Sequence, residues 1–408
     1  WYGTPSVDGE WQHWNHEIMP HWTQSVTDRY PKGKHPSPGE IGANFYPILG
    51  PYSSMNASVL HTHFNWIRRA GAGVCVVSWY PPGRADPAQA ASIEHSDKVV
   101  PLLLRAGEAT GVKIAFHIEP YKGRDASSVA SDIRYIVDMY GGSPAFYRSA
   151  THGDRPVVYV YDSYHTPAHE WARVLSPSGI DTIRGGRYDA VVLALWVRGE
   201  QPQSNSGIED FFVASHFDGA YTYFAGSRFA WASNPGNWRA LRETTQRRNL
   251  LFCPSVGPGY IDTRVRPWNG GNTISRRGGQ HYDQVFGSAL AASPDFISVT
   301  SFNEWHEGTQ IEPATCIDDI DDSVAVAAAA AADDAMDKAT ADNNQGVRRR
   351  SSSSQTPYSP QQQHSRWSAL LPKYQDYGQL SPHYYLDRTR HWARRFEGDD
   401  RAATLPSY

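Results

Sequence analysis

Short apolar runs alternate with longer amphipathic stretches along most of this chain. The pattern repeats about eight times over roughly 270 residues, and a strand followed by a helix is the building unit of a parallel sheet. The strands are expected at 42–47, 74–78, 112–116, 156–161, 190–195, 217–224, 250–254 and 296–300. The helices are expected at 54–70, 93–110, 127–140, 168–175, 207–214, 237–248, 282–292 and 384–396. Eight such units predict an α/β fold, a single (β/α)8 TIM-type barrel with its active site at the C-terminal ends of the strands.

A doubly wound open sheet is the alternative for the same alternation. Its usual mark, a Gly-x-Gly-x-x-Gly motif after the first strand, is missing from the sequence. The strand ends favour the barrel, because polar, aromatic and acidic residues gather there, where a barrel builds its active site. These residues are Trp79, Glu119, Tyr159, His165, Tyr223, Tyr260, Glu304 and Glu307.

The last strand-like run leads into the densest group of such residues, 301–312. Glu304 and Glu307 lie three residues apart around Trp305, and Gly308 breaks any continuation of the strand. On a sharp turn both carboxylates can point into one pocket. In glycoside hydrolysis one acid protonates the leaving oxygen and a second acts on the other side of the bond. The alternative is a solvated loop that carries two ordinary surface acids.

Composition narrows the function classes. Aromatic residues make up 12% of the chain, with 14 Trp and 23 Tyr, and the C–H faces of sugars stack on such rings. The net charge of −4 offers no basic surface for nucleic acid, and no apolar run of about 18 residues spans a membrane. Cys75, Cys253 and Cys316 give neither a disulfide framework nor a metal-ligand spacing, and we expect the first two to be buried thiols. The histidines of residues 1–35 match no zinc pattern, so neither a metal nor a cofactor is predicted.

The chain divides into four parts. An aromatic-rich N-terminal segment, 1–40, is expected to pack on a catalytic barrel that occupies 41–314. Over 315–370, acidic, alanine, arginine and serine runs replace large apolar residues, so we expect a low-complexity, disordered insertion. A C-terminal helix within 371–408 is expected to complete the barrel. The chain opens at Trp1 without Met or a signal peptide, so we expect it to lack its N-terminus.

Short motifs of polar and aromatic residues mark the strand ends and the N-terminal segment. They lie at 1–3, 13–16, 42–47, 52–54, 78–82, 116–121, 159–164, 217–224, 254–262 and 266–269. Together with the acidic stretch 301–312, the most specific of them, they resemble glycoside hydrolase family 99, the endo-α-1,2-mannosidases and mannanases. The resemblance covers about 1–314 and resumes over 374–396.

The resemblance implies a barrel that cleaves internal α-1,2-mannosidic bonds with retention and without a metal. Eukaryotic members act in the Golgi lumen on glucosylated high-mannose N-glycans, so the resemblance implies an N-terminal membrane anchor, which we expect to be missing from this chain. The similar bacterial enzymes also attack fungal mannan. Glu304 would assist the substrate's 2-hydroxyl as it attacks the anomeric carbon to give a 1,2-anhydro sugar. Glu307 would protonate the leaving oxygen and then deprotonate water, which requires a raised pKa. No partner beyond the α-mannoside or N-glycan substrate is implied.

The resemblance and the chemistry together indicate a set of substrate-binding residues. They are Tyr2, Trp79, Glu119, Tyr159, His165, Tyr223, Tyr260, Arg266, Trp268 and Asn269. Structural alternatives are open: core packing for Trp79, Tyr159 and Tyr223, and an ion pair with an arginine for Glu119. The stretch 266–269 has the alternative of a surface loop without substrate contact.

Two other functions compete with the hydrolase. A barrel that kept its sugar pocket would act as a lectin, and loss of Glu304 or Glu307 would favour it, but both are present. A metal-dependent lyase or an unrelated hydrolase would need a His/Asp ligand cluster, and His117 with His165 is too little. N-glycan and mannan both stay open as the substrate, because loop geometry sets the outer subsites.

Overall fold

The computed structural model describes residues 1–84, 95–198, 208–315 and 373–398. The predicted insertion, 315–370, falls outside this part of the chain except for its first residue, and Cys316 lies outside it too. Within the described residues, no helix has both the length and the apolar character needed to cross a bilayer.

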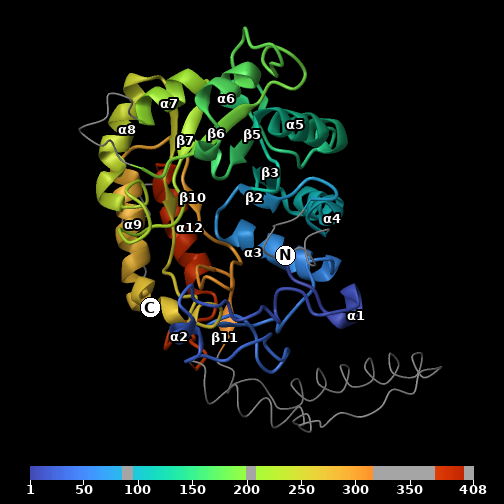
Figure 1. The fold of residues 1–408 in the computed structure, drawn as a ribbon, viewed down its shortest axis with the longest axis vertical. Helices are drawn as coiled ribbons and strands as arrows, with labels where there is room; N and C mark the ends of the chain where they lie inside the picture. Colours follow the sequence, from blue (N-terminus) through green and yellow to red (C-terminus); the bar gives the residue numbers. More distant parts are fainter. Residues whose placement is uncertain (85–94, 199–207, 316–372, 399–408) are drawn as a thin grey trace, which may run out of the picture.

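A curved parallel sheet lies in the middle of the molecule, and its strands pair in chain order (Figure 1). Strand β2 pairs with β3, β3 with β5, β5 with β6, β6 with β7, β7 with β8, and β9 with β10. Only Pro254 separates β8 from β9, so the two form one strand of the barrel. The strand is interrupted there because proline has no backbone N–H to donate to a neighbouring strand. The strands are β2 Val74–Trp79, β3 Lys113–Ile118, β5 Arg155–Val160, β6 Val191–Leu195, β7 Gly219–Tyr221, β8 Leu251–Cys253, β9 Ser255–Val256 and β10 Ser298–Val299. A short β4, Arg148–Ser149, pairs antiparallel with β5.

The first predicted strand of the barrel is much shorter in the structure. The sequence predicts a strand over 42–47, but only β1, Tyr46–Pro47, is a strand, and it pairs antiparallel with β11, Ala314–Thr315. The preceding Asn44 is held by its side chain, whose amide donates to Thr263 Oγ1 at 2.8 Å. A side-chain hydrogen bond to the loop after β9 thus holds this segment, in place of backbone hydrogen bonds to a neighbouring strand. The residue pattern does not reveal this difference.

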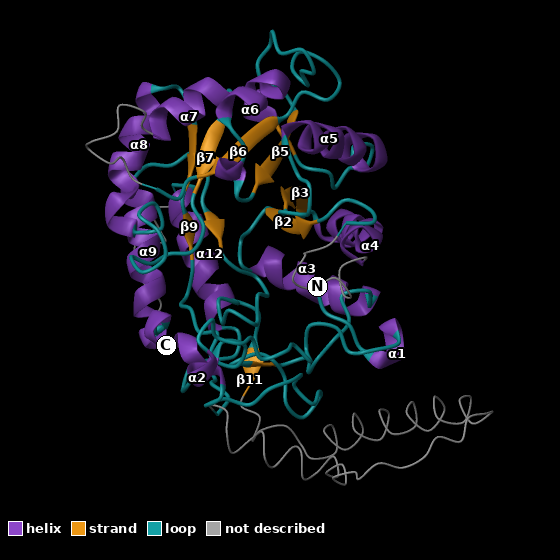
Figure 2. Ribbon diagram, in the orientation of Figure 1, coloured by secondary structure: helices purple, strands orange, loops and turns teal. Residues whose placement is uncertain are grey.

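Helices cover the outer face of the sheet (Figure 2). In α3 the Asn56 side chain accepts two backbone N–H groups as an N-cap, and Leu60, Phe64 and Ile67 form the buried face. The helices are α3 Ala57–Arg69, α4 His95–Thr110, α5 Ala126–Tyr140, α6 Ala168–Leu175, α7 Ile208–Ser215, α8 Trp238–Arg247, α9 Gln280–Ala291 and α12 Tyr384–Phe396. Two single-turn helices, α1 Pro5–Asp8 and α2 Gln24–Thr27, lie in the N-terminal segment.

Helix α12 packs against both α9 and α3. On the α9 side, the Phe286 and Trp392 rings stack with their centroids 5.7 Å apart. On the α3 side, Arg69 and Asp387 form a bidentate pair with distances of 2.8 and 2.7 Å. The last described helix therefore lies beside the first helix of the sheet layer, as the ring of a barrel requires.

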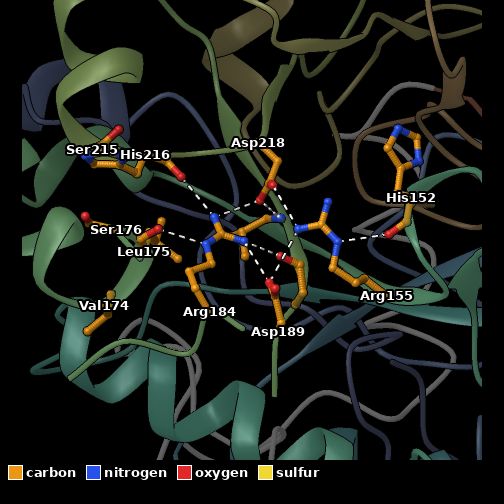
Figure 3. Close-up of polar contacts among 12 residues, drawn as sticks. His152, Arg155, Val174, Leu175, Ser176, Arg184, Asp189, Ser215, His216 and Asp218 are labelled. Carbon is orange, nitrogen blue, oxygen red and sulfur yellow. Dashed lines mark hydrogen bonds and ion pairs between the residues drawn. The ribbon is translucent and has the colours of Figure 1, made fainter. Parts of the chain in front are cut away.

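A charged network closes the barrel at the amino ends of β5, β6 and β7 (Figure 3). Arg184 lies 3.2 Å from Asp189 and 2.9 Å from Asp218, and it donates to three backbone carbonyl oxygens. Arg155 reaches the same two carboxylates at 3.4 and 3.3 Å. Two cations and two anions balance here with further hydrogen bonds, which is the condition for buried charges to be tolerated.

The central strands β5, β6 and β7 are buried on both faces. One apolar core lies inside the barrel, and a larger one lies between the sheet and the helices. The inner core contains Val157, Tyr159, Val191, Leu193, Leu195, Tyr221 and Cys253. Cys253 is a buried thiol, as predicted, whereas Cys75 in β2 is only half-buried. An apolar run with two buried faces does not show which face a given side chain takes.

Candidate active site

The acidic stretch folds back on itself directly after β10. The Ser301 N–H donates to Thr309 O at 3.0 Å, and the Ser301 Oγ accepts the Glu304 N–H at 2.8 Å. Gly308 has a φ of +60°, and a Cβ there would meet the Ile261 backbone oxygen at 2.7 Å. Glycine is therefore needed both for the turn and for its close approach to the neighbouring loop.

The two predicted catalytic carboxylates lie on this turn in different surroundings. The Glu304 side chain is 41% exposed, and its Oε1 accepts the His306 N–H at 3.2 Å. Burial raises the pKa of Glu304, and the His306 N–H opposes that rise. Burial, and then the charge of Glu304, raise the pKa of Glu307 to about 8, while Arg266 opposes the rise. Glu307 therefore keeps a proton at neutral pH.

Tyr2 supports the turn from the far end of the chain. Its hydroxyl accepts the Trp305 N–H at 3.1 Å and lies 3.3 Å from Asn303 O, to which it donates. Burial, followed by the charge of Glu304, raises the pKa of Tyr2 well above its usual value, so the hydroxyl stays protonated. Tyr2 thus holds the backbone on both sides of Glu304.

A group of histidines lies beside the same turn. Burial, together with the nearby His16 and His13, lowers the pKa of His306 well below its usual value. The Nε2 of the neutral ring donates to His13 O at 2.9 Å, since a carbonyl can only accept. The rings of His16 and His306 are 4.7 Å apart. The N-terminal segment therefore forms one side of the site.

Glu312 lies beneath the turn and is fully buried. Its Oε2 accepts from the Tyr52 hydroxyl at 2.7 Å and from the Trp305 indole N–H at 3.0 Å. Its Oε1 lies 3.0 Å from His63 Nε2, and Asn303 donates to the Tyr52 hydroxyl at 3.1 Å. The sequence gives no sign of this arrangement, because Tyr52 lies 260 residues and His63 lies 249 residues before Glu312.

Glu119 follows β3 and is paired with a histidine instead of an arginine. His117 Nδ1 lies 2.7 Å from Glu119 Oε1, and His117 Nε2 lies 2.8 Å from the Tyr221 hydroxyl. The Tyr223 ring stacks on His117 with centroids 5.8 Å apart, and Tyr161 packs edge-on against Tyr223. Burial, followed by the charge of Glu307, raises the pKa of Tyr223 and of Tyr161, which places this aromatic wall near Glu307.

The loop after β9 is organised around a carboxylate that the sequence reasoning does not single out, Asp262. It is almost fully buried and accepts from the Tyr260 hydroxyl at 3.0 Å and from Arg266 Nη1 at 3.0 Å. Asn269 Nδ2 donates to both of its oxygens, at 3.0 and 2.9 Å. Three predicted site residues therefore converge on one buried anion near Glu307. The spacing of Arg266 four residues after an acid was the only available signal.

Trp79 was expected to be a sugar platform, and the structure contradicts this. Its side chain is completely buried, and its indole N–H donates to Asp97 at 2.9 Å in the helix layer. Asp97 also accepts from the hydroxyls of Tyr135 and Tyr140, at 2.8 and 2.7 Å. Trp79 therefore faces away from the barrel interior and belongs to the core, which was the open alternative.

Tyr159 is also corrected. It lies in the inner core, with its ring 5.2 Å from that of Tyr221, so no sugar reaches its face. Side chains alternate along β5, so Tyr161, two residues later, points to the same side but one layer nearer the mouth. Tyr161 is therefore the tyrosine at the end of β5 that lies nearer the mouth of the barrel.

Two further predicted residues lie at the periphery. His165 is exposed on a short 3-10 turn after β5, with its ring 4.4 Å from Tyr164. Trp268 donates its indole N–H to Met19 O at 3.1 Å and packs edge-on against Trp22 at 5.3 Å. Neither contradicts a role in substrate binding. In the described part of the chain, no three His, Cys, Asp or Glu residues form a group able to hold a metal ion.

Comparison with known proteins identifies the family of the chain. Residues 1–345 match the model of glycosyl hydrolase family 99. A human glycoprotein endo-alpha-1,2-mannosidase-like protein is 45% identical over 316 residues, and the Xenopus laevis glycoprotein endo-alpha-1,2-mannosidase is 46% identical over 316 residues. These matches cover 77% of this chain and 67% and 68% of the two relatives, so the chain spans about two thirds of their length.

A solved structure extends the comparison to the fold. The GH99 endo-alpha-mannosidase from Bacteroides thetaiotaomicron superposes with a TM-score of 0.75 at 34% identity, over 98% of this chain and 96% of that one. The predicted (β/α)8 barrel is thereby confirmed, and so is the prediction of a glycoside hydrolase. The chain belongs to glycosyl hydrolase family 99.

Proposed function

We propose that this protein is a retaining, endo-acting α-1,2-mannosidase that cleaves internal α-mannosidic bonds of glucosylated high-mannose N-glycans. The observation that carries the proposal is the pair Glu304 and Glu307 on one turn after β10, with one carboxylate open to solvent and the other able to keep its proton. The names of the human and Xenopus relatives support the same activity.

The two carboxylates take different roles. Glu304 accepts the proton of the substrate's 2-hydroxyl as that oxygen attacks the anomeric carbon, which gives a 1,2-anhydro sugar. Glu307, with its pKa raised to about 8, donates its proton to the leaving oxygen and later takes one from the incoming water. In an α-mannoside the axial 2-oxygen stands anti to the leaving group, so the substrate supplies its own nucleophile. Two acids on the same turn then suffice, without a pair that straddles the ring.

The residues around the pair position the glycan. Tyr223 and Tyr161 form an aromatic wall for the apolar face of a sugar near Glu307. Glu119, fixed by His117, and Arg266, fixed by Asp262, offer charged hydrogen-bonding groups to sugar hydroxyls. His165, Tyr260 and Asn269 are proposed to complete the subsites, and Tyr2 is proposed to hold the turn itself.

We also propose that the enzyme works in the Golgi lumen, where glucosylated high-mannose glycans are trimmed. The support is the likeness to relatives named for glycoproteins. The bacterial endo-alpha-mannosidase of the same fold keeps a mannan polymer as the second candidate substrate.

The test is incubation with a glucosylated high-mannose glycan, with fragment masses read by mass spectrometry and the released anomer by NMR. Release of an intact glucosyl-mannose disaccharide in the α configuration is expected. Glu307→Gln should abolish cleavage of the glycan but spare a substrate with an activated aryl leaving group, because such a group leaves without a proton. Equal losses on both substrates would overturn the acid assignment.

Other outcomes assign the alternatives. Cleavage of yeast mannan alone would keep the mechanism and change the substrate. Binding of the glycan without any cleavage would make the protein a lectin, and release of a β anomer would exclude the retaining mechanism.

A further inference from the structure

Trp22 is the most exposed large apolar residue in the described part of the chain. It is 82% exposed, although an indole offers more apolar surface than any other side chain. It lies two residues before α2, in the part of the N-terminal segment that contacts Trp268 in the loop after β9. A single exposed apolar residue needs no explanation by itself, so the case rests on how Trp22 is held.

The indole of Trp22 is held by neighbouring rings. The His21 ring lies 3.7 Å from it, and the Trp268 ring packs edge-on at 5.3 Å. His21 itself is fixed by two hydrogen bonds. Its ring Nδ1 accepts the Thr23 backbone N–H at 2.9 Å, and its backbone N–H donates to Thr27 Oγ1 at 2.9 Å. We call His21, Trp22 and Trp268 the outer aromatic cluster. An exposed ring that is already immobilised loses little entropy when a ligand stacks on it.

The outer aromatic cluster is tied to the active-site loop. The Met19 N–H donates to Val265 O at 2.9 Å, and the Trp268 indole N–H donates to Met19 O at 3.1 Å. Trp268 lies between Arg266 and Asn269, whose side chains both bind Asp262. The loop that carries Arg266 and Asn269 is therefore bonded directly to the segment that carries Trp22.

We propose that Trp22 is a remote sugar-binding platform, on which a pyranose of the glycan outside the subsites at the scissile bond stacks its apolar face. The ligand class follows from the site. A flat exposed indole that is backed by the His21 and Trp268 rings matches a ligand with an apolar C–H face. The inference rests on the proposed function for the identity of the glycan.

The test compares binding along a length series of α-mannose oligosaccharides. Glu307→Gln prevents turnover, and calorimetry measures the Kd of each oligosaccharide with and without Trp22→Ala. A lost aromatic contact is worth about 0.5–1.5 kcal/mol, so the Kd of the longest ligands should rise about 2- to 12-fold. The shortest ligands that fill only the scissile-bond subsites should bind unchanged, and Trp22→Phe should restore most of the loss.

The controls separate the platform from folding and from the proposed function. Ile180→Ala removes an apolar residue that is equally exposed, at 81%, on the connection from α6 to β6 at the opposite end of the barrel, and should leave every Kd unchanged. Because Trp22 is so exposed, Trp22→Ala should unfold at the same urea concentration as the parent protein. Equal Kd values for long ligands with and without Trp22, or equal losses for short and long ligands, would refute the platform.

The proposed function has its own readout in the wild-type protein. Long oligosaccharides that bind with a Trp22-dependent Kd but are never cleaved would remove the enzyme assignment and leave the platform standing. Cleavage without any length-dependent effect of Trp22→Ala would do the opposite. Failure of every oligosaccharide to bind would overturn both.

Discussion

Replacing Glu307 by Gln should make the folded protein more stable near neutral pH, because the raised pKa is a cost of folding. The unfolded carboxyl loses its proton near pH 4.5, whereas the folded one keeps it until about pH 8. Between these values the folded state binds more protons than the unfolded state, so stability falls as pH rises. At about 1.36 kcal/mol per pH unit, the loss reaches about 3 kcal/mol at pH 7. Solvent screening at this half-buried side chain reduces the figure to about 2 kcal/mol.

Urea unfolding at pH 4 and at pH 7 measures this cost. At pH 4 the carboxyl is protonated in both states, so Glu307→Gln should match the wild type within about 0.5 kcal/mol. At pH 7 the variant should be about 2 kcal/mol more stable. Glu243→Gln, at a side chain that is 58% exposed, should change little at either pH. A stability difference that is the same at both pH values would show that the Glu307 pKa is not raised, and Glu307 would then be unsuited to donate a proton at rest.

Three other predictions follow from the charges and packing. Activity on the natural glycan should fall as pH rises through about 8, because Glu307 then loses its proton. Arg266→Met should move this alkaline limb of the kcat/KM profile to higher pH, since Arg266 lowers the Glu307 pKa. An alkaline limb that does not move would contradict the interaction between Arg266 and Glu307. Arg184→Met should cost about 1.5–3 kcal/mol in urea unfolding with KM unchanged, because Asp189 and Asp218 then keep only Arg155 as a cation, far from the active site. A variant as stable as the wild type would refute the role of the network. Trp79→Phe should cost about 1–3 kcal/mol, because Asp97 loses one of its three hydrogen-bond donors, and should leave kcat/KM unchanged. A tenfold loss of kcat/KM at normal stability would return Trp79 to the sugar site.

The strongly periodic elements were predictable from the sequence. The helices expected over 168–175 and 384–396 have these bounds in the structure, because their apolar residues recur with helical spacing between clear ends. The strand expected over 217–224 shrinks to Gly219–Tyr221, since Phe224 already has a φ of +59° and turns the chain away. Local pattern thus gave the elements, and loop geometry decided where they end.

The candidate site was predictable only for residues that follow the end of a strand, because that position alone puts them at the mouth of the barrel. Glu304 and Glu307 could be singled out because they follow a strand end closely. Trp79 and Tyr159 were misassigned because both faces of a barrel strand are buried, so neither the face nor the depth of a ring appears in the sequence. Asp262 and Glu312 were missed as organising groups because their partners come together only through the folded loops.

The bond between Tyr2 and Trp305 has a consequence for how the enzyme is made. Its two residues are 303 positions apart, so Tyr2 leaves the ribosome long before its partner exists. At a synthesis rate of about 5–20 residues per second, the wait is roughly 15 to 60 s. Contacts of such long sequence separation carry the largest loop-closure cost and form late in folding. The turn that carries Glu304 is therefore complete only after the N-terminal segment has met the stretch that follows β10.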